Sequence, residues 1–294
     1  MTISVTPLAD PARTASSHRL AWLASGAEGA PAGSAYLRVF TAAGQDHLAE
    51  LEIGVHPAER RRGVGSRLLE AAVDAARQHR RRSVIAQAVA DSPAERFLAA
   101  RGFRKVLTLT YARLDLATAD HAALAAVADR PHPGYRLTSW QGTVPEELIA
   151  TFTASRRAMD DMPMDDTDYG TVVWDEERVR SAAAAIAARG EVLRTVAVVA
   201  ESTGAIVGFT ELVVPADGTG DAQHYGTAVL PEHRGRGLAR WLKAAAVRDA
   251  REHHPALAGL LTDTADSNHA MRGLNDSLGY APTHRSTEYQ LDLG

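Results

Sequence analysis

The sequence contains no cysteine among its 294 residues. Disulfide bonds, thiolate metal ligands and a cysteine nucleophile are therefore excluded. Lysine is also scarce, since it occurs only at Lys105 and Lys243. Acidic residues outnumber basic ones, 36 against 32, and the resulting net charge of −4 argues against a dedicated nucleic-acid-binding protein. The sequence shows no pattern typical of a metal site, so we expect no bound metal.

Long hydrophobic runs are missing as well. No apolar stretch approaches the ~20 residues that a membrane-spanning helix needs. The segment before His18 shows no basic stretch followed by an apolar one, so it does not resemble a secretory signal. We therefore expect a cytoplasmic protein without a membrane partner. Its length fits two domains of roughly 150 residues each.

Two segments of the chain repeat each other. One runs V-H-P-A-E-R-R-R-G-V-G from Val55, and the other runs V-L-P-E-H-R-G-R-G-L-A from Val229. The offset that aligns Val55 with Val229 also aligns the proline, arginine and glycine positions, and it continues into the alanines that follow. An alanine-rich composition alone cannot align all of these residue types. The pattern indicates a duplicated domain.

Each copy of the motif follows a predicted strand, at 47–55 or 223–229, and precedes a predicted helix. Glycines at such a turn let the backbone approach a ligand closely. The N–H groups at the helix N-terminus then favour an anion such as a pyrophosphate, and a flanking arginine adds charge. The motif matches neither G-x-x-x-x-G-K-[ST] nor G-x-G-x-x-G, so the mononucleotide P-loop and the dinucleotide fingerprint both fit poorly.

The pattern V-x-P-x-x-[QR]-x-x-G-x-[GA] resembles the acetyl-CoA motif of the GNAT N-acetyltransferase superfamily, and the tandem layout is similar to that of mycothiol synthase and related two-domain acetyltransferases. The resemblance implies an α/β fold of two tandem GNAT-like domains, each a mixed central sheet flanked by helices, with acetyl-CoA as co-substrate. In that family the strand before the motif splays from its neighbour, and the loop amides hold the pyrophosphate of CoA.

The resemblance also implies a set of cofactor-binding residues. In the second copy these are Ala228, Val229, Arg234, Gly235, Arg236, Gly237, Leu238 and Ala239, and in the first copy Val55, Arg60, Arg61, Arg62, Gly63, Val64 and Gly65. A backbone N–H near Ala228–Val229 is the expected oxyanion donor.

A second family block, N-x-x-A-x-x-Φ-Y, supplies an asparagine that touches the cofactor and a tyrosine that protonates the departing thiolate. Asn268 matches the asparagine, whereas Asn275 stands at the tyrosine position. The first copy has Asp91 and Leu98 at these two positions. Neither half therefore has the usual acid. We expect Asn275 to hydrogen-bond the cofactor without donating a proton.

The expected division is a truncated, non-catalytic N-terminal domain over 1–118, a linker over 119–134 and a catalytic C-terminal domain over 135–294. The chain before the strand predicted at 18–24 is too short to supply the helices that wall an acceptor pocket, so the first copy lacks them. The second copy has room for them. Its predicted elements are a strand at 135–140, helices at 144–158 and 174–189, and a hairpin over 191–214.

The resemblance implies transfer of acetyl from acetyl-CoA to a primary amine of a small molecule, by direct attack. Two alternatives stay open: acetylation of a cysteinyl pseudodisaccharide as in mycothiol synthase, and a catalytically inactive CoA-binding regulatory protein. A partner other than the small-molecule amine is not expected. The identity of the amine and the oligomeric state do not follow from the sequence.

The general base is the point at which the second copy departs most from the family pattern. Family members often carry an acid three residues before the motif valine, where the first copy has Glu52 but the second has Gly226. Glu211 on the preceding strand is the first candidate. His224 is the second, because it lies two residues before Gly226 and is expected on the same strand face, with Tyr225 on the opposite face.

The segment 159–169 between the two predicted helices carries five carboxylates in nine residues. They either attract a cationic amine or belong to a solvated loop.

Overall fold

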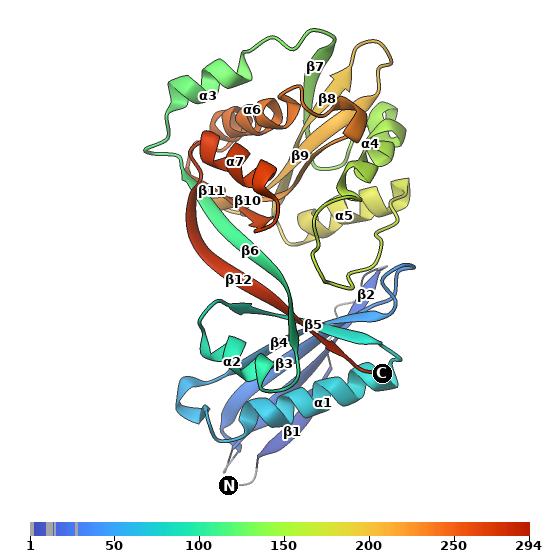
Figure 1. The fold of residues 1–294 in the computed structure, drawn as a ribbon, viewed down its shortest axis with the longest axis vertical. Coiled ribbons are helices and arrows are strands. Elements are labelled where there is room, and N and C mark those ends of the chain that lie inside the picture. Colours follow the sequence, from blue (N-terminus) through green and yellow to red (C-terminus); the bar gives the residue numbers. More distant parts are fainter. Residues whose placement is uncertain (1–2, 10–13, 15, 27–28) are drawn as a thin grey trace. The chain divides into compact units, whose positions relative to one another are not determined.

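The computed structural model describes residues 3–9, 14, 16–26 and 29–294 (Figure 1). The chain forms two compact units. Unit 1 contains residues 1–108, 164–173 and 285–294, and unit 2 contains residues 109–163 and 174–284. Each unit has a mixed sheet with helices packed on it, so the predicted tandem α/β architecture is confirmed.

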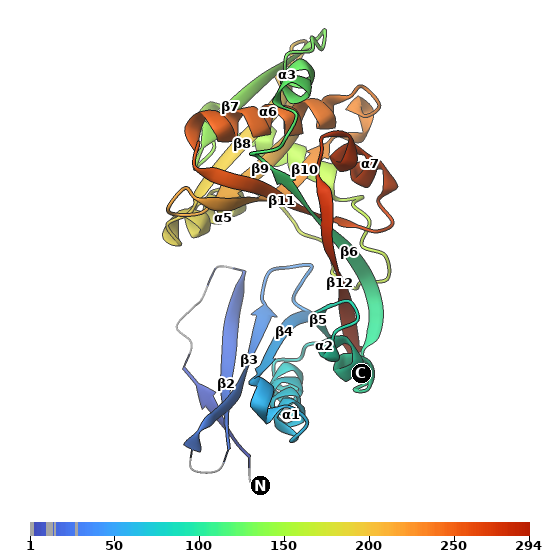
Figure 2. The same cartoon turned by 90° about the vertical axis from the view of Figure 1, so that its left-hand side faces the viewer.

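The strands of unit 1 are, in sheet order, β1 (Ser4–Leu8), β2 (Ser17–Ser25), β3 (Pro31–Phe40), β4 (Leu48–Val55), β5 (Ser83–Val89) and the end of β12 (Ala281–Asp292). The helices are α1 (Val64–Gln78) and the short α2 (Pro93–Ala99). One face of α1 is apolar and buried, with residues at helical spacing from Val64 to Ala76. This face lies against β3 and β4 (Figure 2).

The strands of unit 2 are, in sheet order, the end of β6 (Arg104–Asp115), β11 (Leu257–Ala265), β10 (Gly220–Val229), β9 (Ile206–Val214), β8 (Val192–Ala200) and β7 (Tyr135–Gln141). The helices are α3 (His121–Ala128), α4 (Ile149–Ser155), α5 (Glu176–Ala188), α6 (Leu238–His253) and α7 (His269–Ser277). The helix predicted over 144–158 is shorter than expected, because α4 is flanked by 3₁₀ turns at Glu146–Leu148 and Arg156–Met159.

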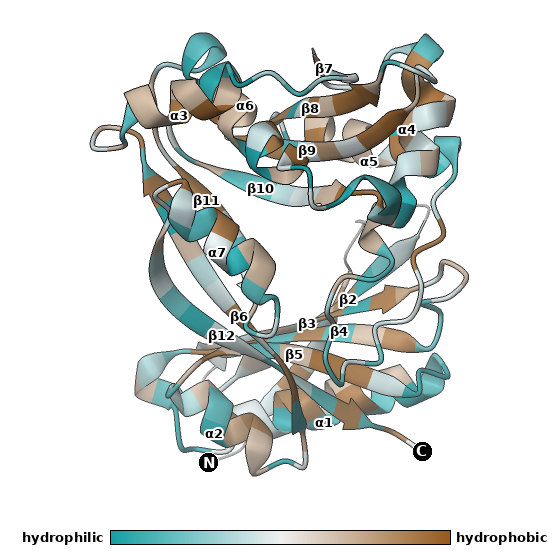
Figure 3. Ribbon diagram, turned by 45° about the horizontal axis from the view of Figure 1, so that its top comes forward, coloured by the Kyte–Doolittle hydropathy of each residue, from teal (hydrophilic) through white to brown (hydrophobic). Residues whose placement is uncertain are grey.

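Strand β9 is buried at every position, and its apolar character is visible in Figure 3. Side chains alternate between the two faces of a strand. Leu212 packs in a core cluster with α6, whereas Glu211 and α5 line the same cavity. The helices therefore cover both faces of the sheet at β9, and any pocket at Glu211 lies on the α5 face.

The boundaries of the units differ from the predicted ones. Residues 286–292 of β12 pair with β5 in unit 1, and residues 109–115 of β6 pair with β11 in unit 2. The acidic segment is divided too, since 164–173 lies in unit 1, where Thr171 N–H donates to Gly44 O at 3.2 Å. Pairing between segments so distant in sequence leaves no local pattern from which the boundary could be predicted.

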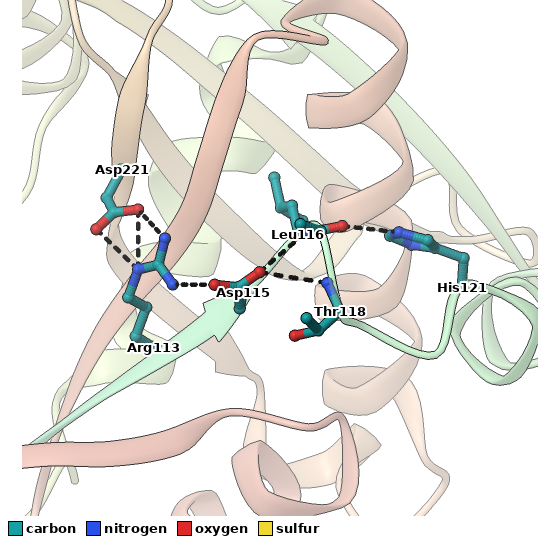
Figure 4. A network of polar contacts seen from close by, with 7 residues as sticks. Arg113, Asp115, Leu116, Thr118, His121 and Asp221 are labelled. Carbon is teal, nitrogen blue, oxygen red and sulfur yellow. Dashed lines mark hydrogen bonds and ion pairs between the residues drawn. The ribbon is translucent and has the colours of Figure 1, made fainter.

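An ion pair crosses three strands of the unit 2 sheet (Figure 4). Arg113 on β6 donates from Nε to both carboxylate oxygens of Asp221 on β10, at 2.9 and 3.0 Å, and from Nη1 to Asp115 at 2.7 Å. Gly259 on β11 lies beneath this pair. A Cβ at that position would come within 2.6 Å of Asp221 Oδ1 and 2.7 Å of Arg113 Cζ. The glycine is therefore required by the close approach of the two side chains.

Candidate functional site

The two parallel strands of unit 2 separate before the repeated motif. β10 pairs with β11 only from Gly220 to Gln223, whereas its pairing with β9 continues to Val229. Leu230 N–H donates to Val207 O on β9 at 2.8 Å. Because successive amides of an antiparallel strand point to opposite sides, the N–H of Val229 points away from β9, toward the side where β11 has left. This amide therefore faces the gap between β10 and β11.

Unit 1 shows the same separation. β4 pairs with β5 only from Leu48 to Leu51, while its pairing with β3 continues to Val55. The duplication seen in the sequence thus extends to the strand geometry.

The loop after β10 has a backbone suited to an anion. Gly235 and Gly237 have φ of 75° and 78°, in the left-handed region that favours glycine. Gly237 is the N-cap of α6, and the first bond of the helix runs from Trp241 N–H to Gly237 O at 3.0 Å. The amides of Leu238 and Ala239 therefore precede the first intrahelical bond. They present N–H donors at the positive end of the helix dipole, which fits a pyrophosphate.

Arg234 supports this loop from within. Its Nε donates to Val229 O at 2.8 Å, its Nη2 to Ala158 O at 3.2 Å, and both Nη atoms bind Asp161 at 2.5 and 2.8 Å. The arginine in turn lowers the pKa of Asp161. The guanidinium expected to bind an anion is thus already committed. Arg236 is exposed and forms no ion pair within the described part of the chain, so it is the better candidate.

The loop of unit 1 repeats this backbone. Arg61 and Gly63 have φ of 62° and 87°, and Arg60 Nε donates to Val55 O at 3.3 Å as Arg234 does in the other copy. Arg62 pairs with Glu59 at 3.2 Å. Val64 and Gly65, the last predicted residues of this copy, form the first turn of α1.

The two asparagines of the second block both form hydrogen bonds within unit 2. The side chain of Asn268 caps α7 by accepting from Met271 N–H at 3.1 Å. Asn275 is only 3% exposed, and it is held between Lys243 Nζ at 2.6 Å and Thr264 Oγ1 at 3.2 Å. The expectation that Asn275 hydrogen-bonds the cofactor is therefore not supported by its surroundings, because both ends of the amide are occupied inside the core.

The face predicted for His224 is wrong. The register of β10 against β9 shifts between His224 and Gly226, which makes Tyr225 the extra residue of a β-bulge. The bulge reverses the alternation: Gly226 lies opposite Glu211, whereas His224 lies opposite Leu212 on the other face. Tyr225, expected to point away, lines the same cavity as Glu211.

His224 belongs instead to a buried polar network. Its Nε2 lies 2.8 Å from the hydroxyl of Tyr280, and its Nδ1 lies 3.3 Å from Thr210 Oγ1. Burial and the nearby charge of Lys243 lower the pKa of His224 well below its usual value. Burial likewise lowers the pKa of Lys243 to about 7. His224 is therefore neutral, enclosed and unsuited to take a proton from a substrate.

A cavity of about 150 Å³ lies on the α5 face of unit 2. A row of paired residues crosses the sheet beneath it: Trp140 on β7 is opposite Thr195 on β8, and Thr195 is opposite Glu211 on β9. The row leads on to the bulge of β10. Among the described residues that line the cavity, Glu211 is the only carboxylate.

Arg156 holds Glu211 in place. Its Nη1 and Nη2 donate to the two carboxylate oxygens at 2.8 and 2.5 Å, and both side chains are buried. The guanidinium carbon also lies 4.5 Å from the ring centre of Trp174 and 4.7 Å from those of Phe152 and Phe209. This arrangement fixes the carboxylate in one orientation toward the cavity.

Sequence reasoning missed Arg156 and Lys243. Nothing in the local sequence distinguishes Arg156 from its exposed neighbour Arg157, because only the tertiary structure buries it. Lys243 could have been found. It lies four residues before Val247 on the apolar face of α6, where a lysine is unusual.

The described residues of unit 1 contain no helices equivalent to α4 and α5. Within the described ranges, no group of three or more His, Asp or Glu side chains is placed to hold a metal ion. None of the helices found there is both long and apolar enough to cross a membrane.

Comparisons with known proteins agree with this geometry. The chain matches the model of the Acetyltransferase (GNAT) family over residues 4–103 and again over 158–280. A search among curated proteins finds no match. Among solved structures, a tandem GNAT protein from the clavulanic acid biosynthesis pathway, determined without acetyl-CoA, is 25% identical, with a TM-score of 0.76 over 96% of this chain and 85% of that one.

Two further structures share the fold. A GCN5-related N-acetyltransferase from Sphaerobacter thermophilus has 19% identity and a TM-score of 0.66, covering 93% of this chain and 80% of that one. A glucosamine N-acetyltransferase region of a fungal multi-domain β-N-acetylglucosaminidase has 13% identity and a TM-score of 0.68, covering 93% of this chain and 33% of that one.

Proposed function

Because the chain belongs to the acetyltransferase (GNAT) family, we propose that unit 2 transfers an acetyl group from acetyl-CoA to the primary amine of a small molecule, by direct attack. One observation carries this proposal. Strand β10 runs from the cavity, which Tyr225 lines, past Gly226 opposite Glu211, to the separated strands at Val229. An amine held at the cavity and a thioester held between the strands would meet along this short stretch of backbone.

The loop amides of residues 235–239, together with Arg236, would hold the pyrophosphate of CoA. Acetyl-CoA, when bound, supplies the activated acetyl group. The N–H of Val229 would donate to the carbonyl oxygen, where negative charge develops during attack. The loop of unit 1 would bind a second CoA, but without helices to form an acceptor pocket this unit would be non-catalytic.

We assign Glu211 as the group that takes the proton from the incoming ammonium. Only the neutral amine can attack, so a proton acceptor at the cavity is needed. Asn275 is buried in the place of the family's tyrosine, so no acid at this position protonates the departing thiolate. A thiol has an ordinary pKa near 8.5, and its thiolate is therefore stable enough to leave without a proton donor. The apolar lining of the cavity does not favour the pseudodisaccharide alternative.

The test is thiol release from acetyl-CoA with a panel of primary amines. Glu211→Gln should lower kcat/KM by at least about a hundredfold, with the affinity for acetyl-CoA little changed. The matched control is Asp249→Asn. Asp249 forms a comparably buried bidentate pair with Arg194, at 2.8 and 2.5 Å, and does not line the cavity.

Equal losses in the two variants would show that breaking a buried pair, rather than removing a base, lowers the activity. Binding of acetyl-CoA without turnover of any amine would favour the inactive CoA-binding alternative.

A further inference from the structure

The cavity of unit 2 is suited to a compact apolar group. Trp140, Phe152 and Trp174 supply aromatic walls, and Ala182 and Ile186 of α5 supply an aliphatic one. Its volume is about 150 Å³. A dry apolar cavity of about 150 Å³ takes a benzene ring. The size therefore fits one six-membered ring or one branched aliphatic group.

The cation that such an aromatic cage would bind is already present. The guanidinium of Arg156 occupies the space between Trp174, Phe152 and Phe209 and pairs with Glu211. An ammonium group deep in the cavity, among the aromatic walls, would be repelled by Arg156. A second positive charge on the acceptor is thus disfavoured inside the cavity.

Two residues that line the cavity each carry a buried polar atom without a hydrogen-bond partner within the described residues. These atoms are Nε of Arg156, a residue that is 7% exposed, and Oγ1 of Thr195, a residue that is 1% exposed. Arg156 Nε can only donate, and the hydroxyl of Thr195 can donate or accept. Buried donors of this kind are expected to have partners, so the missing partner is a hydrogen-bond acceptor.

We propose that the acceptor of unit 2 is a primary amine that carries a compact apolar group with one hydrogen-bond acceptor atom, and that this group enters the cavity while the amine stays toward β10. This assignment rests on the proposed acetyl transfer, in which the amine accepts the acetyl group. It excludes di- and polyamines, whose second charge Arg156 would repel, and highly hydroxylated amino sugars, which carry more hydroxyls than the two unpaired polar atoms can bind.

Binding of small probes to the full-length protein tests the cavity without any turnover. Calorimetry would compare the binding of anisole, toluene and tetramethylammonium. Anisole, which carries an oxygen acceptor, should bind about tenfold more tightly than toluene of similar shape, and tetramethylammonium should not bind. Equal affinity for anisole and toluene, or preference for the cation, would overturn the proposal.

Two variants locate the bound probe. Ala182→Leu fills the cavity from α5 and should weaken anisole binding at least tenfold, whereas Ala184→Leu, at an exposed position on the same helix, should not. An unchanged affinity in Ala182→Leu would place the probe elsewhere and contradict the proposal. The comparison of probes on the unaltered protein remains decisive should Ala182→Leu fail to fold.

Rates of acetyl transfer to two amines then test whether the cavity selects the acceptor. With acetyl-CoA, 2-(4-methoxyphenyl)ethylamine should exceed 1,4-diaminobutane in kcat/KM by at least a hundredfold. Equal rates for the two amines would overturn the proposal. If anisole binds as expected but no amine is acetylated, the cavity chemistry stands and the proposed function alone fails.

Discussion

Arg61 and Gly235, which occupy equivalent positions in the two copies of the motif, adopt the same left-handed backbone conformation, with φ of 62° and 75°. Each is the second residue before the N-cap glycine of a helix, α1 or α6. A left-handed conformation costs a residue with a Cβ roughly 1–2 kcal/mol. The first copy keeps the loop shape even though arginine disfavours it. The strand and helix that flank the loop therefore impose this shape, and glycine only lowers its cost.

Replacing Gly235 by alanine should destabilise unit 2 by about 1 kcal/mol, because of its backbone conformation alone. No atom lies within 4 Å of a Cβ built at Gly235. Gly273 offers a matched control. A Cβ built there also has no atom within 4 Å, but Gly273 lies inside α7 and its φ is not positive. Gly273→Ala should stabilise the unit by about 0.5–1 kcal/mol. Urea unfolding measures both, and two changes of the same sign would contradict this account.

Arg236 should contribute more to binding acetyl-CoA than Arg234, whose guanidinium is already held by Asp161. Arg236→Glu should raise the KM for acetyl-CoA at least about tenfold, and added salt should reduce the difference because the site is exposed. Arg251→Glu makes the same charge change in the last turn of α6 and should leave this KM unchanged. If both substitutions act equally, net charge rather than a local contact determines the affinity.

Lys243 should make stability depend on pH in a defined window. Burial lowers its pKa from 10.5 to about 7. Between these two values the unfolded chain binds more protons than the folded one, so the free energy of unfolding rises with pH, by up to about 1.4 kcal/mol per unit. Below pH 7 both states are protonated and the dependence disappears.

Replacing Lys243 by methionine should remove that rise. Urea unfolding between pH 7 and 9 should show the original protein gaining up to about 2 kcal/mol relative to Lys243→Met. The same change at the exposed Lys105 should leave the pH dependence intact. Parallel curves for the original protein and Lys243→Met would mean that the buried lysine stays protonated throughout.

The sequence predicted those parts of the site that depend on a local backbone pattern. The glycine turns and the helices after them follow from residues within one short motif, such as Val229 to Ala239, and the strand separation is implied by the family that this motif resembles. The hairpin predicted over 191–214 is present as β8 and β9 for the same reason, since alternation and a turn are local features.

The face of the unit 2 sheet on which Glu211 and Tyr225 lie could not be predicted in this way. A single extra residue at Tyr225 reverses which side chains face the cavity, and bulges leave no clear signal in one sequence. The expectation for His224 failed on this point. The pairing of Arg156 with Glu211 joins residues 55 positions apart, so it depends on how the 3₁₀ turn after α4 packs on β9.

The C-terminal strand provides the last prediction. Residues 286–292 pair with the whole of β5, and Tyr289, which is 5% exposed, packs in the core of unit 1 with its hydroxyl 2.6 Å from Glu95. A chain that ends at Arg285 loses this strand and leaves alternate amides of residues 83–89 without acceptors. Loss of the tyrosine ring alone should cost unit 1 about 3–5 kcal/mol.

Hydrogen exchange followed peptide by peptide distinguishes the two units in this truncated chain. Amides of residues 83–89 should exchange at least a hundredfold faster than in the full chain, whereas those of β9 should keep their protection because their partners lie within unit 2. A chain ending at Asp292 retains all seven pairs with β5 and should behave as the full chain does. Fast exchange in β9 after truncation at Arg285 would show that the two units unfold together, and unchanged exchange in β5 would contradict the pairing itself.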